Sequence, residues 1–184
     1  GPHPAVELEG AVRRLLRAEP LGRGPSAPVW LLGTDPSVRR LWGRLCATGR
    51  RPSRERPRGK KREWHDKLKY FLGHRPAAFR VEEAEPTMVH AVLPSEGGPD
   101  HDQARRVAAV AALVGAVEAA IATLLEGGAG TASACQVEGF VPLDDVRRAP
   151  LVRAAWSHCR CGPSDRLAYF LRHSEAFEVR EEVR

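Results

Sequence analysis

Residues 50–62, RRPSRERPRGKKR, gather more charge of one sign than any other stretch of this 184-residue chain. They hold eight cations against one carboxylate, Glu55, and two prolines that interrupt a helix. The cations of this basic segment are Arg50, Arg51, Arg54, Arg56, Arg58, Lys60, Lys61 and Arg62. Because each cation that meets a phosphate releases a counterion, such a run favours binding to a phosphate backbone. The alternative is a solvated linker in which PRGKKR acts as a nuclear-import signal.

A predicted helix over residues 63–74 follows the basic segment and extends the set of candidate nucleic-acid contacts. Its polar candidates are Trp64, His65, Lys67 and Lys69, next to the apolar Leu68, Phe71 and Leu72. Trp64 has charged neighbours, which favours an exposed ring able to stack on an unpaired base. The sequence therefore predicts a nucleic-acid-binding site made of the basic segment and this helix, without separating DNA from RNA.

Charge is divided unevenly along the chain, whose formal net charge is +6. Residues 1–92 hold 19 Lys and Arg against 10 Asp and Glu, whereas residues 93–184 hold 10 against 13. The first half alone is basic, and a basic half suits a polyanion such as nucleic acid. We expect residues 105–184 to serve as a scaffold or to bind a protein partner.

The elements that position these residues follow one order in the first 93 residues. The pattern predicts a helix over 6–19, a strand over 29–32, a helix from Pro36 capped by Thr34 or Asp35, a helix over 63–74, and strands over 79–81 and 88–93. Helix, strand, helix, helix and hairpin is the order of a winged helix, a variant of the helix-turn-helix motif.

The second half begins after a polar linker, residues 94–104, with an apolar stretch over 107–125 that carries one charge, Glu118. Its length admits a transmembrane helix. Its alanine content and its internal charge instead predict a helix buried on both sides and no membrane association. Further helices are expected over 143–156, with a break at Pro150, and over 166–173, followed by a strand over 177–179.

Two segments of the chain resemble one another, KLKYFLGHRPAAFRVEE at 67–83 and RLAYFLRHSEAFEVREE at 166–182. The matched positions are Tyr70 with Tyr169, Phe71 with Phe170, His74 with His173, Phe79 with Phe177 and Val81 with Val179. Chance similarity between amphipathic helices is the alternative. The repeat predicts a helix-dominated α+β fold with two tandem winged-helix-like domains, residues 1–93 and 105–184. Phe71 and Phe170 are expected in the cores, and His74 and His173 as imidazolium ions at helix C-termini.

The cadence of Phe71-Leu72 followed by P-x-x-F-x-V at residues 76–81 resembles the N-terminal region of Egalitarian-type proteins. Those proteins are RNA-binding adaptors that also carry a 3′–5′ exonuclease-like domain. The resemblance covers the end of the third helix and the first wing strand of each repeat. It implies a winged-helix-like fold and RNA binding. The acidic cluster of the exonuclease is missing from this sequence, so no catalytic residue carries over.

Other motifs that carry chemistry are missing from the sequence, including G-x-x-x-x-G-K-[ST], H-E-x-x-H and G-x-S-x-G. SHCRC at residues 157–161 lacks the second Cys/His pair of a structural zinc site. We therefore expect no enzyme, no cofactor and no metal, the alternative being an enzyme that uses Cys159 and Cys161. The lack of a signal peptide predicts an intracellular protein of the nucleus or of a cytoplasmic ribonucleoprotein. The opening Gly1-Pro2 predicts a piece excised from a larger protein.

Overall fold

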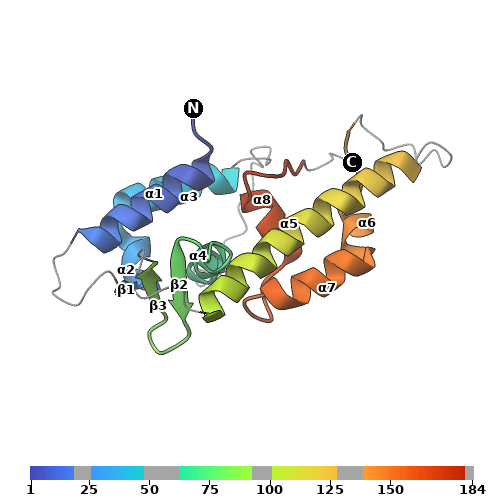
Figure 1. The fold of residues 1–184 in the computed structure, drawn as a ribbon. Coiled ribbons are helices and arrows are strands. Elements are labelled where there is room, and N and C mark those ends of the chain that lie inside the picture. The colour runs from blue at the N-terminus through green and yellow to red at the C-terminus, as the bar shows by residue number, and fades with distance from the viewer. Residues whose placement is uncertain (19–25, 48–62, 93–100, 128–138, 181–184) are drawn as a thin grey trace. The chain divides into compact units, whose positions relative to one another are not determined.

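The computed structural model describes residues 1–18, 26–47, 63–92, 101–127 and 139–180, without the side chains of residues 63–66. Helices dominate these ranges, and one small antiparallel sheet accompanies them (Figure 1). The prediction of a helix-dominated α+β fold is confirmed. The chain divides into a first unit, Gly1–Pro99 with Tyr169–Arg184, and a second unit, Asp100–Ala168. The predicted division at the linker 94–104 differs from this, because it assigns Tyr169–Arg184 to the second domain.

The first unit opens with α1, Pro4–Arg17, as the apolar periodicity of the sequence predicts. Pro4 occupies the first turn, where its missing N–H leaves no hydrogen bond unmade. The His3 side chain caps the helix, since its Nδ1 accepts a hydrogen bond from the Ala5 N–H at 3.2 Å. One stripe of the helix is buried, and its members are Ala5, Leu8, Ala11, Val12 and Leu16.

The predicted strand over 29–32 is wrong, because these residues form a short helix, α2, Val29–Thr34. The strand lies just before it as β1, Ser26–Pro28. In α2 the residues Val29, Leu32 and Gly33 are buried while Trp30 is 52% exposed. Burial at positions i, i+3 and i+4 is the helical period, so this run packs one side against the core as a helix does.

Helix α3, Pro36–Ala47, begins where the sequence predicts. The Asp35 carboxylate oxygen Oδ1 accepts hydrogen bonds from the backbone N–H groups of Ser37 at 2.8 Å and Val38 at 3.0 Å. Asp35 is therefore the N-cap of α3. The Thr34 hydroxyl, the other candidate for this role, donates to the Leu31 carbonyl.

Helix α4, Glu63–Gly73, and the strands β2, Phe79–Glu82, and β3, Met88–Ala91, follow where the sequence predicts a helix and a hairpin. The first unit has one helix more than predicted, because α2 stands where a strand was expected. The sheet order is β1-β3-β2, and both pairings are antiparallel. In the register, Val89 lies opposite Val81 of β2 and opposite Ala27 of β1. Strand β1 lies at the edge of the sheet, where Pro28 is tolerated because one side of its backbone has no partner strand.

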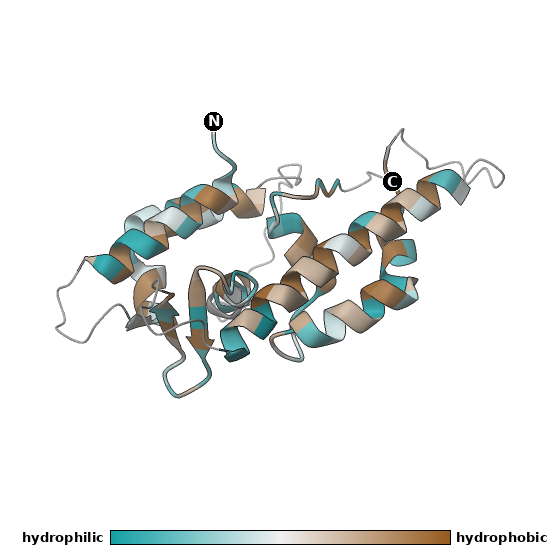
Figure 2. Ribbon diagram, viewed as in Figure 1, coloured by the Kyte–Doolittle hydropathy of each residue, from teal (hydrophilic) through white to brown (hydrophobic). Residues whose placement is uncertain are grey.

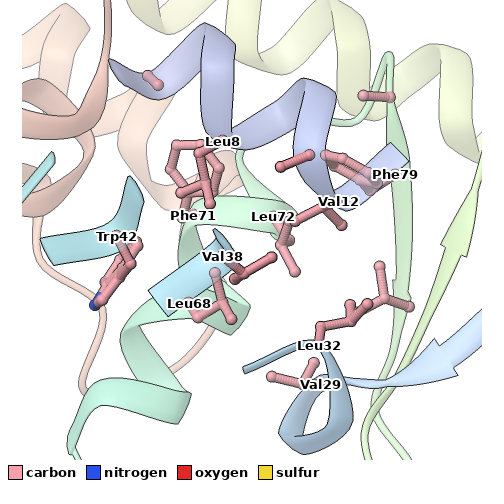
Figure 3. Close-up of a cluster of buried hydrophobic side chains, with 14 of the residues drawn as sticks. Leu8, Val12, Val29, Leu32, Val38, Trp42, Leu68, Phe71, Leu72 and Phe79 are labelled. Atoms are coloured by element: carbon pink, nitrogen blue, oxygen red, sulfur yellow. The ribbon is translucent and has the colours of Figure 1, made fainter. Parts of the chain in front are cut away.

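One hydrophobic core joins α1, α2, α3, α4 and the sheet of the first unit (Figure 3). Phe71 is 1% exposed and meets the Trp42 ring edge-on, with the ring centroids 6.0 Å apart. Phe79 is equally buried and comes from β2. The expected burial of Phe71 is confirmed, as is that of Phe170, which is 5% exposed.

Helix α8, Leu167–His173, carries the matched half of the repeat, and its residues from Tyr169 onward belong to the first unit. The ring of Phe71 meets that of His173 edge-on at 6.3 Å, and His74 meets Phe170 edge-on at 5.2 Å. The ends of the two matched helices thus pack on each other, and the Phe of each helix contacts the His of the other.

The strand half of the repeat is not formed. Residues 177–179 adopt no strand, so that prediction is wrong, and Phe177 is half-buried whereas Phe79 lies in the core. Arg75 holds this segment instead: its Nη2 bonds Glu175 at 2.6 Å while its Nη1 bonds Glu9 of α1 at 2.8 Å. An extended segment with no neighbouring strand makes no inter-strand hydrogen bonds, so a strand conformation would not be stabilised here. The charge-assisted bond between Glu175 and Arg75 stabilises the segment instead.

The second unit consists of α5, His101–Gly127, α6, Leu143–Arg148, and α7, Pro150–Cys159. The predicted break at Pro150 is confirmed, since Pro150 begins α7 and only Ala149 separates it from the end of α6 at Arg148. Helix α5 packs against α6 and α7. It does so through a narrow stripe whose buried residues are Leu113 and Val117.

Helix α5 is long and apolar enough, by length and composition alone, to cross a membrane. The prediction that it is buried on both sides is wrong, because 11% of its most apolar 18-residue window is buried. The apolar colour extends over most of its length in Figure 2, with polar residues near its ends. The expectation of no membrane association stays a prediction.

Candidate nucleic-acid interface

The basic segment, residues 50–62, lies outside the described residues, and so do the side chains of Trp64 and His65. In the sequence, its eight cations lie between the end of α3 at Ala47 and the start of α4 at Glu63. Their role in binding stays a prediction that rests on the sequence.

Lys67 and Lys69 are the predicted contacts whose side chains the structure describes, and both are engaged within the first unit. The Lys67 Nζ lies 5.1 Å from the centre of the Tyr169 ring. The Lys69 Nζ bonds the Glu83 carboxylate at 2.6 Å and lies 5.8 Å from the Tyr70 ring centre. A phosphate would have to compete with these partners for either ammonium group.

The C-terminal part of α4 belongs to the core. None of its side chains from residue 67 to residue 74 is exposed, and Leu68, Tyr70, Phe71, Leu72 and His74 are buried. This part of the helix therefore offers little surface to a groove of nucleic acid. We expect base contacts from α4 to come mainly from its first turn, which includes Trp64 and His65.

Arginines on α1 and α3 were missed as candidates in the sequence. Arg14, Arg17, Arg39 and Arg40 are exposed, and among the described residues none of the four has an ion-pair partner. The available signal was their position on the polar faces of two amphipathic helices. Their charge density is lower than that of the basic segment, so charge density alone does not single them out.

The two matched histidines lie in an aromatic cluster. His173 is 7% exposed, its ring centroid lies 5.1 Å from that of Trp42, and the Tyr169 ring is stacked on it at 6.5 Å. Burial lowers the pKa of His173 from 6.5 to about 3, helped by the nearby cations Arg172, Lys67 and Arg75 and by His74. The expectation of an imidazolium at the C-terminus of α8 is therefore wrong, because His173 stays neutral as a member of the core.

This pKa makes the stability of the protein depend on pH. The unfolded chain binds a proton at His173 below pH 6.5 while the folded chain does not, so stability falls as the pH drops from 6.5 toward 3. Between pH 7.5 and 4.5 we expect His173 to account for a loss of about 2–3 kcal/mol, measured by chemical denaturation. His173→Gln should lack this part of the pH dependence, and the exposed His158→Gln should retain it. Equal pH dependence in the wild type and His173→Gln would contradict the assignment.

The SHCRC stretch ends in a loop closed by its own hydrogen bonds. The Asp165 Oδ2 accepts from the Cys161 N–H at 2.9 Å, and the Arg160 side chain donates to the carbonyls of Gly162 at 2.9 Å and Pro163 at 2.5 Å. Burial, and secondly the charge of Asp165, raise the pKa of the Cys159 thiol to about 11. A thiol that stays protonated is a poor nucleophile, which favours a structural role for Cys159.

No known protein family, curated protein or solved structure matches this chain in the comparisons.

Proposed function

We propose that the chain is a nucleic-acid-binding module of a larger protein, whose first unit is winged-helix-like and which binds mainly the phosphate backbone. The observation that carries this proposal is the placement of eight cations in one segment between α3 and α4 of a small basic unit. Counterion release makes such a segment a strong, sequence-independent binder of RNA or DNA. Its place of action is the nucleus or a cytoplasmic ribonucleoprotein.

The topology of the first unit supports the winged-helix part of the proposal. In a winged helix, the first strand pairs with the second strand of the C-terminal hairpin, and helices lie between them in the sequence. The sheet order β1-β3-β2 of the first unit has this arrangement. In a helix-turn-helix domain the scaffold helices cross the backbone while one helix faces the nucleic acid. The resemblance of residues 67–81 to Egalitarian-type proteins favours RNA over DNA.

The direct test is a titration of the chain with single- and double-stranded DNA and RNA at about 50 and 200 mM salt. With four or five phosphate contacts from the basic segment, we expect this segment to contribute about −3.6 to −4.5 to the slope of log affinity against log salt on duplex DNA. On single strands its contribution should be about −2.8 to −3.5. An absence of binding to every one of these probes at the lower salt would refute the proposed function.

A second candidate function is protein binding through residues 105–184, and the exposed apolar side chains of the second unit favour it. Leu151 is 70% exposed, Leu125 is 41% and Val107 is 39%. These side chains, on α5 and α7, could supply apolar contacts to a protein partner. In this case the basic segment would serve nuclear import or bind an acidic partner, and the titration above would show no binding.

A further inference from the structure

We infer that α1 and α3 carry a second phosphate-binding surface, formed by Arg14, Arg17, Arg39 and Arg40. We name these four residues the arginine patch. The inference rests on the proposed function and extends it, because it assigns phosphate contacts to two folded helices in addition to the basic segment. The ligand is the sugar-phosphate backbone of a nucleic acid that reaches the basic segment as well.

The acidic residues around the patch are already occupied. The Glu7 carboxylate bonds Arg44 at 2.8 Å. The Glu9 carboxylate bonds Arg13 at 3.3 Å and Arg75 at 2.8 Å. Asp35 caps α3. The four arginines of the patch thus keep their full charge, and the described residues near them offer no carboxylate to neutralise it.

The two helices bring Arg14 and Arg40 to one seam. Helices α1 and α3 pack on each other and run in opposite directions (Figure 1). The Glu7–Arg44 bond shows which sides meet. Arg14 lies two turns after Glu7 on the same side of α1, and Arg40 lies one turn before Arg44 on the same side of α3. Because the helices are antiparallel, both steps lead the same way along the seam, so Arg14 and Arg40 border it together.

The side chains that surround these arginines on the surface of α3 are mostly short. Apart from arginines, Arg44 among them, the exposed residues of α3 are Pro36, Ser37, Gly43 and Ala47, whose side chains are all small. A Cβ added at Gly43 would meet nothing within 4 Å. A backbone of phosphates can therefore approach α3 closely, and planar guanidinium groups can bind its oxygens in the bidentate manner that arginine favours.

In the sequence, the basic segment follows α3 closely. Arg40 and Arg44 are about 6 Å apart along the axis of α3 at 1.5 Å per residue. The helix ends at Ala47, and the basic segment begins at Arg50. Residues 36–54 contain no Asp or Glu, so no carboxylate interrupts the cations of this stretch of sequence.

The test uses the full chain with all four patch arginines replaced by glutamine, Arg14→Gln, Arg17→Gln, Arg39→Gln and Arg40→Gln. Glutamine has nearly the helix propensity of arginine, so the fold is expected to survive, which circular dichroism and thermal melting check. The matched control replaces four exposed arginines of the second unit with the same loss of charge, Arg105→Gln, Arg106→Gln, Arg153→Gln and Arg166→Gln. If the patch variant melts early, Arg39→Gln with Arg40→Gln alone takes its place.

We expect the patch variant to flatten the salt slope by about 1.8–3.6 on duplex DNA and about 1.4–2.8 on single-stranded RNA, for two to four lost contacts. The control variant should keep the wild-type slope. Unchanged binding by the patch variant, with wild-type binding intact, overturns the inference and leaves the proposed function standing. Equal flattening in both variants also overturns it, because net charge alone would then explain the effect. A loss confined to poly-glutamate, used as a non-nucleic-acid probe, overturns it in favour of an acidic protein.

Discussion

Replacing Phe71 by alanine is expected to lower the free energy of unfolding by about 3–5 kcal/mol. The ring is 1% exposed and lies where three elements of the first unit meet. It touches Trp42 of α3 and His173 of α8 edge-on, and the Arg75 guanidinium carbon lies 4.7 Å from its centre. Truncation removes these contacts and leaves a cavity that rigid neighbours cannot fill. Denaturant unfolding followed by the fluorescence of tryptophan measures the loss.

The control for this variant is Leu151→Ala, which removes apolar atoms from a residue that is 70% exposed. It should change stability by less than about 0.5 kcal/mol. Phe71→Leu keeps most of the volume and should cost less than Phe71→Ala, which keeps the comparison open if the alanine variant does not fold. A loss below about 1 kcal/mol for Phe71→Ala would contradict the packing described for this core.

Replacing Lys60, Lys61 and Arg62 with alanine is expected to flatten the slope of log affinity against log salt by about two to three units. Each cation that contacts a phosphate contributes one released counterion, and the effect should be the same for every nucleic-acid sequence because phosphates carry no sequence information. Titrations at several salt concentrations, with the wild type in parallel, measure the change. Binding that survives neutralisation of all eight cations would remove the basic segment from the site.

Two further variants separate charge from stacking in the same titrations. Trp64→Ala leaves the charge unchanged and should leave the salt slope unchanged. If Trp64 stacks on an unpaired base, its loss should still cost about 1–3 kcal/mol on single strands. Arg147→Ala with Arg148→Ala removes charge from the net-acidic half, where both arginines lie near carboxylates. That pair should change little, and an effect as large as that of the basic segment would contradict the charge argument.

Local patterns predicted the elements whose signals are long or chemically specific. The N-cap at Asp35, the break at Pro150 and the hairpin of β2 and β3 each follow from residue types with a defined local effect. The structure of residues 29–32 was predicted wrongly, because a run of four apolar residues fits one turn of a buried helix as well as a short strand. Only the neighbours of Val29 and Leu32 in the folded chain decide between the two.

The elements that were predicted wrongly depend on contacts distant in sequence. Helix α5 is apolar on most sides, which indicates double-sided burial, yet it packs through a stripe around Leu113 and Val117. Residues 177–179 alternate like a strand, but they pair with no described strand. The neutral His173 is a similar case, since its neighbours in the sequence do not indicate that Trp42 and Phe71 pack against it in the fold.

The candidate site was predicted from charge density, and charge density alone does not say which cations are free. Lys69 lies in the predicted site but bonds Glu83, which is fourteen positions away in the sequence. Arg14 and Arg40 were not predicted and have no ion-pair partner among the described residues. The partners of each side chain come from tertiary contacts, and these decide which charges remain for a ligand.

The return of Tyr169–Arg184 to the first unit has a consequence for synthesis on the ribosome. The residues that surround His173 on α3 and α4 leave the ribosome long before His173 does, because the second unit, Asp100–Ala168, is translated in between. At about 5–20 residues per second, those residues take roughly 3–14 s to emerge. During this interval Trp42 and Phe71 lack one of their neighbours, and an apolar surface of the nascent chain is open to chaperones. The late segment Tyr169–Arg184, and not residues 1–99, sets the moment at which this part of the protein reaches its native packing.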